Sequence, residues 1–130
     1  MLCVALLIVP MGLLVAVLPT WAEHQHAARV AAREAARIAA HADGPGEAVG
    51  GATQMASQVL SNHAVAAHDV LGVGVDVDAD GAGRLERGGQ VHVEVSVRVP
   101  VRGIPLLGDI GGFTWTTGHR ERIDDYRSLP

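Results

Sequence analysis

The first 22 residues, MLCVALLIVPMGLLVAVLPTWA, carry no charged side chain. As a helix with a rise of 1.5 Å per residue they would extend about 33 Å, close to the ~30 Å hydrocarbon core of a bilayer. A small water-soluble domain has no place for a helix that is apolar on every side. The segment therefore predicts contact with a membrane. The rest of the chain is the part that this segment either anchors to the membrane or directs across it.

Two interpretations of residues 1–22 remain open. A cleaved signal peptide requires a basic n-region, a short apolar core and a small-residue cleavage site, to which Thr20-Trp21-Ala22 corresponds only loosely. A retained span fits the length of the apolar run better, and Trp21 stands where an interfacial aromatic residue belongs. A buried helix of a soluble protein is disfavoured, because the remaining residues are too few to cover it. We expect a retained transmembrane segment.

Composition limits what can follow the apolar segment. Only four residues are aromatic: Trp21, Phe113, Trp115 and Tyr126. The core outside the membrane must therefore consist of Val, Ala, Leu and Ile side chains in one small domain. The net charge of −4 gives no reason to expect nucleic acid as a partner. The single cysteine, Cys3, lies inside the apolar run and cannot form an intramolecular disulfide.

Residues 23–42, EHQHAARVAAREAARIAAHA, favour a helix that continues unbroken from the span, because alanine dominates and no Gly or Pro interrupts it. Three arginines recur every four residues and form a polar stripe, for which a solvated face is a better explanation than a partner-binding surface. They are Arg29, Arg33 and Arg37. A row of small residues with the same spacing would let another helix approach closely. This row is Ala28, Ala32, Ala36 and Ala40.

The next segment predicts a second helix. Asp43-Gly44-Pro45-Gly46 contains the Gly and Pro that commonly end helices. Residues 47–67 then show apolar side chains at helical spacing, which we expect to form one buried face. These side chains are Val49, Ala52, Met55 or Ala56, Val59 and Leu60.

Beyond this helix the apolar period changes from 3.6 to 2, which indicates strands. Residues 73–79 and 91–101 alternate valine with polar or glycine residues and are separated by the glycine-rich segment 81–90, so they predict a β-hairpin. Residues 103–108 read as an apolar connection with turn residues. A third strand is expected over residues 113–123, with Phe113, Trp115 and Thr117 on one face.

Together these elements predict an α+β fold: a long N-terminal transmembrane helix, a second helix, and a small antiparallel sheet of about three strands with one face on the helices. The corresponding divisions are a transmembrane segment (1–22), a helix continuing from the span (23–42), and a small α+β domain (43–130).

Two groups of residues invite a metal-binding interpretation. Asp76, Asp78 and Asp80 match the first half of a calcium-loop pattern, but position twelve is Arg87 instead of Glu, and three acids on the solvent face of a strand explain them equally well. The seven histidines lack the spacing of zinc ligands, so surface histidines are the better interpretation. They are His24, His26, His41, His63, His68, His92 and His119. We predict no catalytic set, no metal site and no cofactor.

The charge is unevenly distributed. Residues 43–90 carry seven acidic and two basic side chains, whereas residues 23–42 carry three arginines and two glutamates. The asymmetry could guide packing between protomers or docking on a basic partner, or it could serve only solubility, which we favour.

The order of these segments resembles the TadE-like pseudopilins, minor pilin-like components of tight-adherence (Flp) pilus systems. The resemblance rests on LLVAVLPTWA (13–22), HQHAARVAAREAARIAAHA (24–42), VHVEVSVRVPVRGIP (91–105) and RERIDDYRS (120–128). Family members begin with a basic leader, a prepilin-peptidase site and a glutamate just inside the apolar segment, whereas the first acid here is Glu23. No site residue is carried over from the family.

The resemblance implies a pilin-like fold and a membrane-anchored, non-enzymatic component of a pilus assembly or secretion system. Its partners would be the lipid bilayer and other pilin-like subunits or pilus and secretion machinery, and its C-terminal domain would lie outside the cytoplasm. The positive-inside rule, applied to Arg29, Arg33 and Arg37 alone, would place that domain in the cytoplasm. The alternative function is a secreted or periplasmic binding domain released after signal-peptide cleavage. An enzyme or a metal-binding protein is the least favoured of the three functions, because no group of residues supports it.

Overall fold

The computed structural model describes residues 2–101 and 111–125. It contains the helices α1 (Leu2–Ala40) and α2 (Pro45–Asn62), a short 3₁₀ helix η1 (Ala67–Asp69), and the strands β1 (Val70–Val77), β2 (Gln90–Pro100) and β3 (Gly112–Arg122). The predicted α+β fold is confirmed. The apolar connection expected at residues 103–108 lies outside the described residues.

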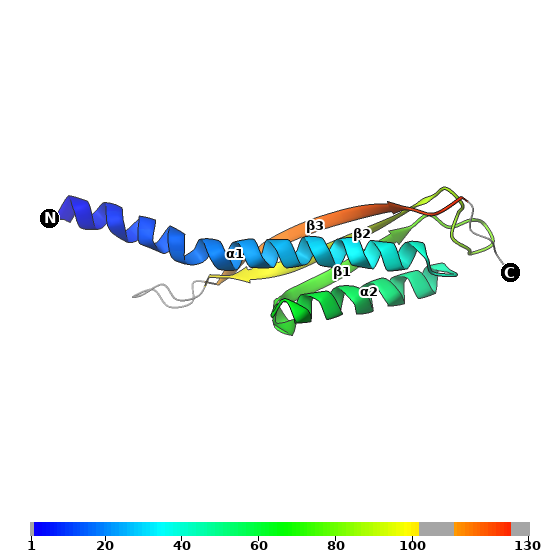
Figure 1. Ribbon diagram of the computed structural model, residues 1–130, viewed down its shortest axis with the longest axis horizontal. Helices are drawn as coiled ribbons and strands as arrows, with labels where there is room; N and C mark the ends of the chain where they lie inside the picture. The colour runs from blue at the N-terminus through cyan, green and yellow to red at the C-terminus, as the bar shows by residue number, and fades with distance from the viewer. Residues whose placement is uncertain (1, 102–110, 126–130) are drawn as a thin grey trace.

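The molecule is elongated, and one half of α1 projects from it (Figure 1). α1 is one continuous helix of 39 residues, with Pro10 and Pro19 inside it. Its C-terminal half lies against the sheet and runs beside α2, whereas its N-terminal half extends beyond both. The predicted continuity of the helix between the span and residues 23–42 is therefore confirmed.

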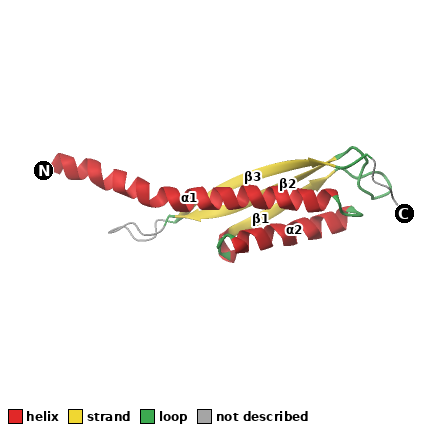
Figure 2. Cartoon of the chain, viewed as in Figure 1, coloured by secondary structure: helices red, strands yellow, loops and turns green. Residues whose placement is uncertain are grey.

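The three strands form an antiparallel sheet in the order β1-β2-β3. Both helices pack on one face of it, and no helix of the described residues covers the other face (Figure 2). The valines of β2 point to the helices because alternate side chains of a strand lie on opposite faces. All five are buried: Val91, Val93, Val95, Val97 and Val99. The predicted β-hairpin forms, with Val73, Val75 and Val77 opposite Val95, Val93 and Val91.

The boundaries differ from the predictions by a few residues at most places. α2 ends at Asn62, not at residue 67, and Ala64 adopts a positive φ of 58° just beyond it. Such a left-handed residue commonly follows the end of a helix. β1 begins at Val70 and ends at Val77, while Ala79 pairs with Leu85 in an isolated bridge.

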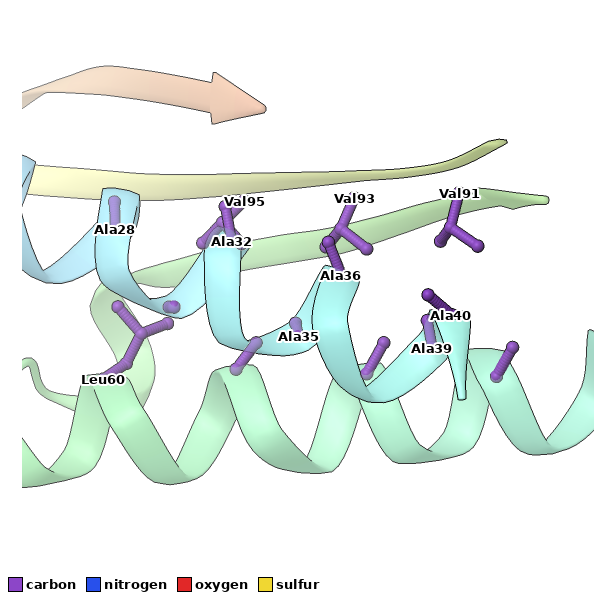
Figure 3. Packing of buried hydrophobic residues seen from close by; sticks show 14 of the residues in the cluster. Ala28, Ala32, Ala35, Ala36, Ala39, Ala40, Leu60, Val91, Val93 and Val95 are labelled. Atoms are coloured by element: carbon purple, nitrogen blue, oxygen red, sulfur yellow. The ribbon is translucent and has the colours of Figure 1, made fainter. Parts of the chain in front are cut away.

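Two neighbouring rows of alanines on α1 form the centre of the core. All eight are buried: Ala27, Ala31, Ala35 and Ala39 in one row, and Ala28, Ala32, Ala36 and Ala40 in the other. In Figure 3, Ala32 and Ala36 lie beside Val95 and Val93 of the sheet, whereas Ala35 and Ala39 lie on the side of α2. Since residues four apart share a helix face, each row meets a different partner.

This arrangement corrects one expectation. The row that begins at Ala28 was expected to pack on another helix, but it lies under the sheet, and the adjacent row approaches α2. Both rows consist of alanine at the same spacing, so the pattern alone does not distinguish their partners.

The buried face of α2 is also made of small side chains. Its buried residues are Ala48, Ala52, Ala56 and Leu60, again spaced by four. The expectation that Val49 belongs to this face is wrong, since 44% of Val49 is exposed. Gly51 contributes to the close approach, because a Cβ added there would lie 3.0 Å from Cγ2 of Ile38 on α1. The alanine and glycine side chains allow the two helix backbones to come close together.

Candidate functional site: an exposed apolar helix and the aromatic contact at its base

The N-terminal half of α1 presents apolar side chains to the surroundings on all sides. Nine large ones, from Val4 to Leu18, are between 44% and 81% exposed. Soluble monomers rarely expose a contiguous apolar patch of this size. Among the described residues, α1 is the one helix long and apolar enough to cross a membrane, and none of its most apolar stretch is buried in the protein. A signal sequence would satisfy the same criteria of length and composition.

The base of this exposed segment is fixed to the sheet by two tryptophans. The rings of Trp21 on α1 and Trp115 on β3 make an edge-to-face contact, with centroids 6.2 Å apart and planes at 86°. This geometry suits the charge distribution of aromatic rings. The indole nitrogen Nε1 of Trp115 is buried and has no hydrogen-bond partner among the described residues.

The sequence predicted that Trp21 closes the apolar helix and that Trp115 lies on the third strand, but it did not predict their contact. Trp115 lies on the face of the third strand that it was predicted to share with Phe113 and Thr117, and it is half-buried there. Their contact depends on how α1 crosses the sheet. Phe113, two residues before Trp115, belongs to the same face but is 41% exposed, although Val99, opposite it on β2, is fully buried.

The arginine stripe of α1 faces away from the core. Arg29, Arg33 and Arg37 are exposed, which confirms the prediction of a solvated face in the single chain. Among the ion pairs between described residues, none involves these three side chains. The stripe adds charge to the surface of the domain without contributing to its internal packing.

The acidic residues that resemble half a calcium loop hold the turn between β1 and β2. Asp78 Oδ2 accepts a hydrogen bond of 2.9 Å from the backbone N–H of Gln90. Asp80 Oδ1 accepts hydrogen bonds from the backbone N–H groups of Ala82 and Arg84, at 3.0 and 2.8 Å. Side chains of Asp commonly stabilise turns in this way. Within the described residues, no group of three or more His, Cys, Asp or Glu side chains is arranged to hold a metal ion.

The described histidines are distributed over the molecule and make local contacts. His24 and His41 use Nδ1 to contact the carbonyl oxygens of Thr20 and Arg37, one turn earlier in α1. His26 of α1 and His63, which follows α2, stack edge to face with centroids 5.9 Å apart. This ring contact, which the sequence did not suggest, joins the two helices at the end opposite to their connecting turn.

Two further histidines lie near carboxylates. His68 Nε2 is 3.6 Å from Oδ1 of the buried Asp69, and His119 Nε2 is 3.4 Å from Oε2 of Glu121. His92 lies on the other face of the sheet, above Gly118, where a Cβ would meet its Nε2 at 2.6 Å. These histidines therefore lie in separate parts of the fold, and each contacts residues near it.

The helix-free face of the sheet carries a shallow, open concavity of about 750 Å³. It exists because Gly72 and Gly74 have no side chains, and Asp76, His92 and Glu94 lie at its border. The serine on this face, Ser96, exchanges a hydrogen bond of 2.9 Å with the hydroxyl of Thr116 across the strands. This contact pairs two hydroxyl groups and does not place a general base beside the serine.

No family model, no curated protein and no solved structure matches this chain. The fold and the position of its exposed side chains are therefore the basis for assigning a function.

Proposed function

We propose that this protein is a membrane-anchored, non-enzymatic, pilin-like component of a pilus assembly or secretion system, with residues 43–130 outside the cytoplasm. The proposal follows the resemblance to TadE-like pseudopilins. One structural observation supports it most strongly: a single helix has an exposed apolar half of membrane-spanning length and a second half that is the core of a small domain. Its partners are the lipid bilayer and other pilin-like subunits.

The division of α1 into two functional halves fits this role. Residues 3–22 would extend about 30 Å as a helix, which matches the hydrocarbon thickness of a bilayer. The charged residues of the helix begin at Glu23, where the span would end. The domain then packs on the same helix from Ala27 onward, so anchor and domain share one rigid element.

The alternative is a secreted or periplasmic binding domain released by signal-peptide cleavage. Cleavage after Ala22 would remove Trp21 and its contact with Trp115 but leave both alanine rows in place. The continuous helix and the aromatic contact at the boundary therefore favour retention of the apolar segment.

Fractionation of cells followed by mass determination of the intact protein distinguishes the two functions. We expect the protein in the membrane fraction, with residues 3–22 still attached to the domain. A mature chain that begins at Glu23 and occurs in the soluble fraction would contradict the anchored form and support the secreted one.

Cysteine labelling and crosslinking test the remaining parts of the proposal. In a Cys3→Ala background, an exposed Ser57→Cys side chain should react with a membrane-impermeant maleimide in intact spheroplasts, as expected for an extracytoplasmic domain. In the same background, a Leu6→Cys side chain labelled with a benzophenone maleimide, at a position that is 81% exposed, should crosslink on illumination to the apolar helix of another pilin-like subunit. Labelling only after lysis, or crosslinks only to unrelated membrane proteins, would count against the proposal.

A further inference from the structure

The two ends of the sheet differ sharply in charge. At the end where β1 and β3 begin and β2 finishes, the charged side chains among the described residues 67–70, 97–101 and 111–116 are the exposed Arg98 and the buried Asp69, with His68 beside Asp69. At the opposite end, the turn 78–89 and the end of β3 carry many acids and arginines, including Asp78, Asp80 and Arg122. The sparsely charged end lies beside α1 where the helix leaves the sheet (Figure 1).

This sparsely charged end also carries the aromatic side chains of the sheet. Trp115 contacts Trp21, which closes the apolar half of α1, so it lies at the same level along the molecule. Phe113 is two residues earlier on β3, about 7 Å further toward the exposed half of α1 at ~3.4 Å per residue. A distance of about 7 Å corresponds to four or five residues of α1, which places Phe113 near the level of residues 16 and 17, inside the apolar segment.

We propose that this end of the sheet is seated in the interfacial region of the lipid bilayer, with Phe113 inserted and Trp115 at the level of the headgroups. The inference rests on the anchored form proposed above and adds a second point of contact with the membrane. Tryptophan and other aromatic side chains are enriched at membrane interfaces, where one part of the ring meets the apolar region and the rest meets the headgroups. Arg98, exposed at the same end, can keep its guanidinium group among the lipid phosphates while its stem lies along the sheet.

A lipid surface accounts for several features of this end together. The exposed Phe113 lies on the same face of β3 as Trp115, which contacts Trp21 at the base of the exposed apolar half of α1. The small number of exposed charged side chains among the described residues of this end lowers the desolvation cost of approaching the bilayer, compared with the opposite end of the sheet.

The presence of only two tryptophans in the chain makes the proposal directly testable. Full-length Trp115→Phe and Trp21→Phe variants each retain one tryptophan, and a phenylalanine ring keeps most of the aromatic contact. Both would be reconstituted in vesicles of phosphatidylethanolamine and phosphatidylglycerol that contain lipids with a nitroxide at the headgroup, near the glycerol, or at the chain end. We expect both tryptophans to be quenched most by the headgroup and near-glycerol labels and little by the chain-end label.

The outcomes separate this proposal from the proposed anchor. If Trp21 is quenched by the lipid labels while Trp115 is quenched only by aqueous iodide, the transmembrane segment is retained but the end of the sheet does not lie in the interfacial region of the bilayer. If neither tryptophan is quenched by lipid labels, the membrane anchor itself is wrong.

A second measurement uses a matched pair of exposed apolar residues. In the Trp21→Phe background, Phe113→Ser should reduce the lipid quenching of Trp115. Val49→Ser, at a residue of similar exposure (44% against 41%) near the start of α2, should leave it unchanged. Equal quenching in the two variants would overturn the role of Phe113.

Discussion

Small residues determine how closely the elements of this protein approach one another. Eight alanines of α1 and three of α2 are buried, although each offers only one methyl group to the core. Their contribution comes from dispersion contacts between closely packed backbones, since the area that each removes from water is small. A core of this kind has little tolerance for larger side chains, because no rotamer change can make room for them.

At this scale, Ala32→Leu tests the position of the alanine row under the sheet. The three added carbons would meet the valines of β2, so we expect the free energy of unfolding to fall by about 1–3 kcal/mol. Urea unfolding of the full chain in detergent micelles, followed by circular dichroism, measures the change. Ala22→Leu is the control, since Ala22 is exposed on the same helix. Equal urea midpoints for the two variants would contradict the packing of Ala32.

At the scale of the elements, the sequence predicts the secondary structure well and the contacts less well. The change of apolar period from 3.6 to 2 predicted the order of two helices and three strands, and the valine alternation predicted the inner face of β2. The partner of each alanine row was not predictable, because the two rows are equivalent in sequence. The contact between Trp21 and Trp115 also depends on the crossing of α1 over β3, for which no local pattern exists.

The packing of α1 on α2 is tested by two adjacent glycines. Gly50 and Gly51 both lie inside α2, but a Cβ at Gly50 meets no atom within 4 Å, whereas one at Gly51 would lie 3.0 Å from Cγ2 of Ile38. Gly50→Ala should therefore raise the free energy of unfolding by about 1 kcal/mol through helix propensity. Gly51→Ala should raise the free energy of unfolding by less, because the side chain of Ile38 must move to make room for the added methyl group.

Thermal unfolding monitored at the helix signal compares these two variants under identical conditions, each serving as the control of the other. The expected order of midpoints is Gly50→Ala above Gly51→Ala. Equal increases would show that α1 and α2 do not pack as closely at Gly51 as the structure indicates.

At the scale of the whole molecule, the domain uses only the second half of α1. A chain that begins at Glu23 keeps both alanine rows and the complete sheet, and it loses the edge-to-face contact of Trp21 with Trp115. We expect this truncated chain to fold as a soluble domain, less stable by about 0.5–1.5 kcal/mol from the lost aromatic pair, and to lose its association with membranes.

Circular dichroism and size-exclusion chromatography of residues 23–130 provide the measurement. Full-length Trp21→Ala in micelles serves as the reference for loss of the aromatic contact alone. An unfolded or aggregated truncated chain would mean that the apolar half of α1 is needed for folding as well as for anchoring.

The continuity of α1 has a mechanical consequence. A flexible linker between a membrane anchor and a domain would let the domain rotate freely and would absorb an applied load by extending. Here the described structure has no linker at this place, because the helix that leaves the sheet is the same helix that would enter the bilayer. A force applied to the domain would therefore be transmitted along the axis of α1. A small tilt of the helix in the bilayer would displace the far end of the sheet by a larger distance.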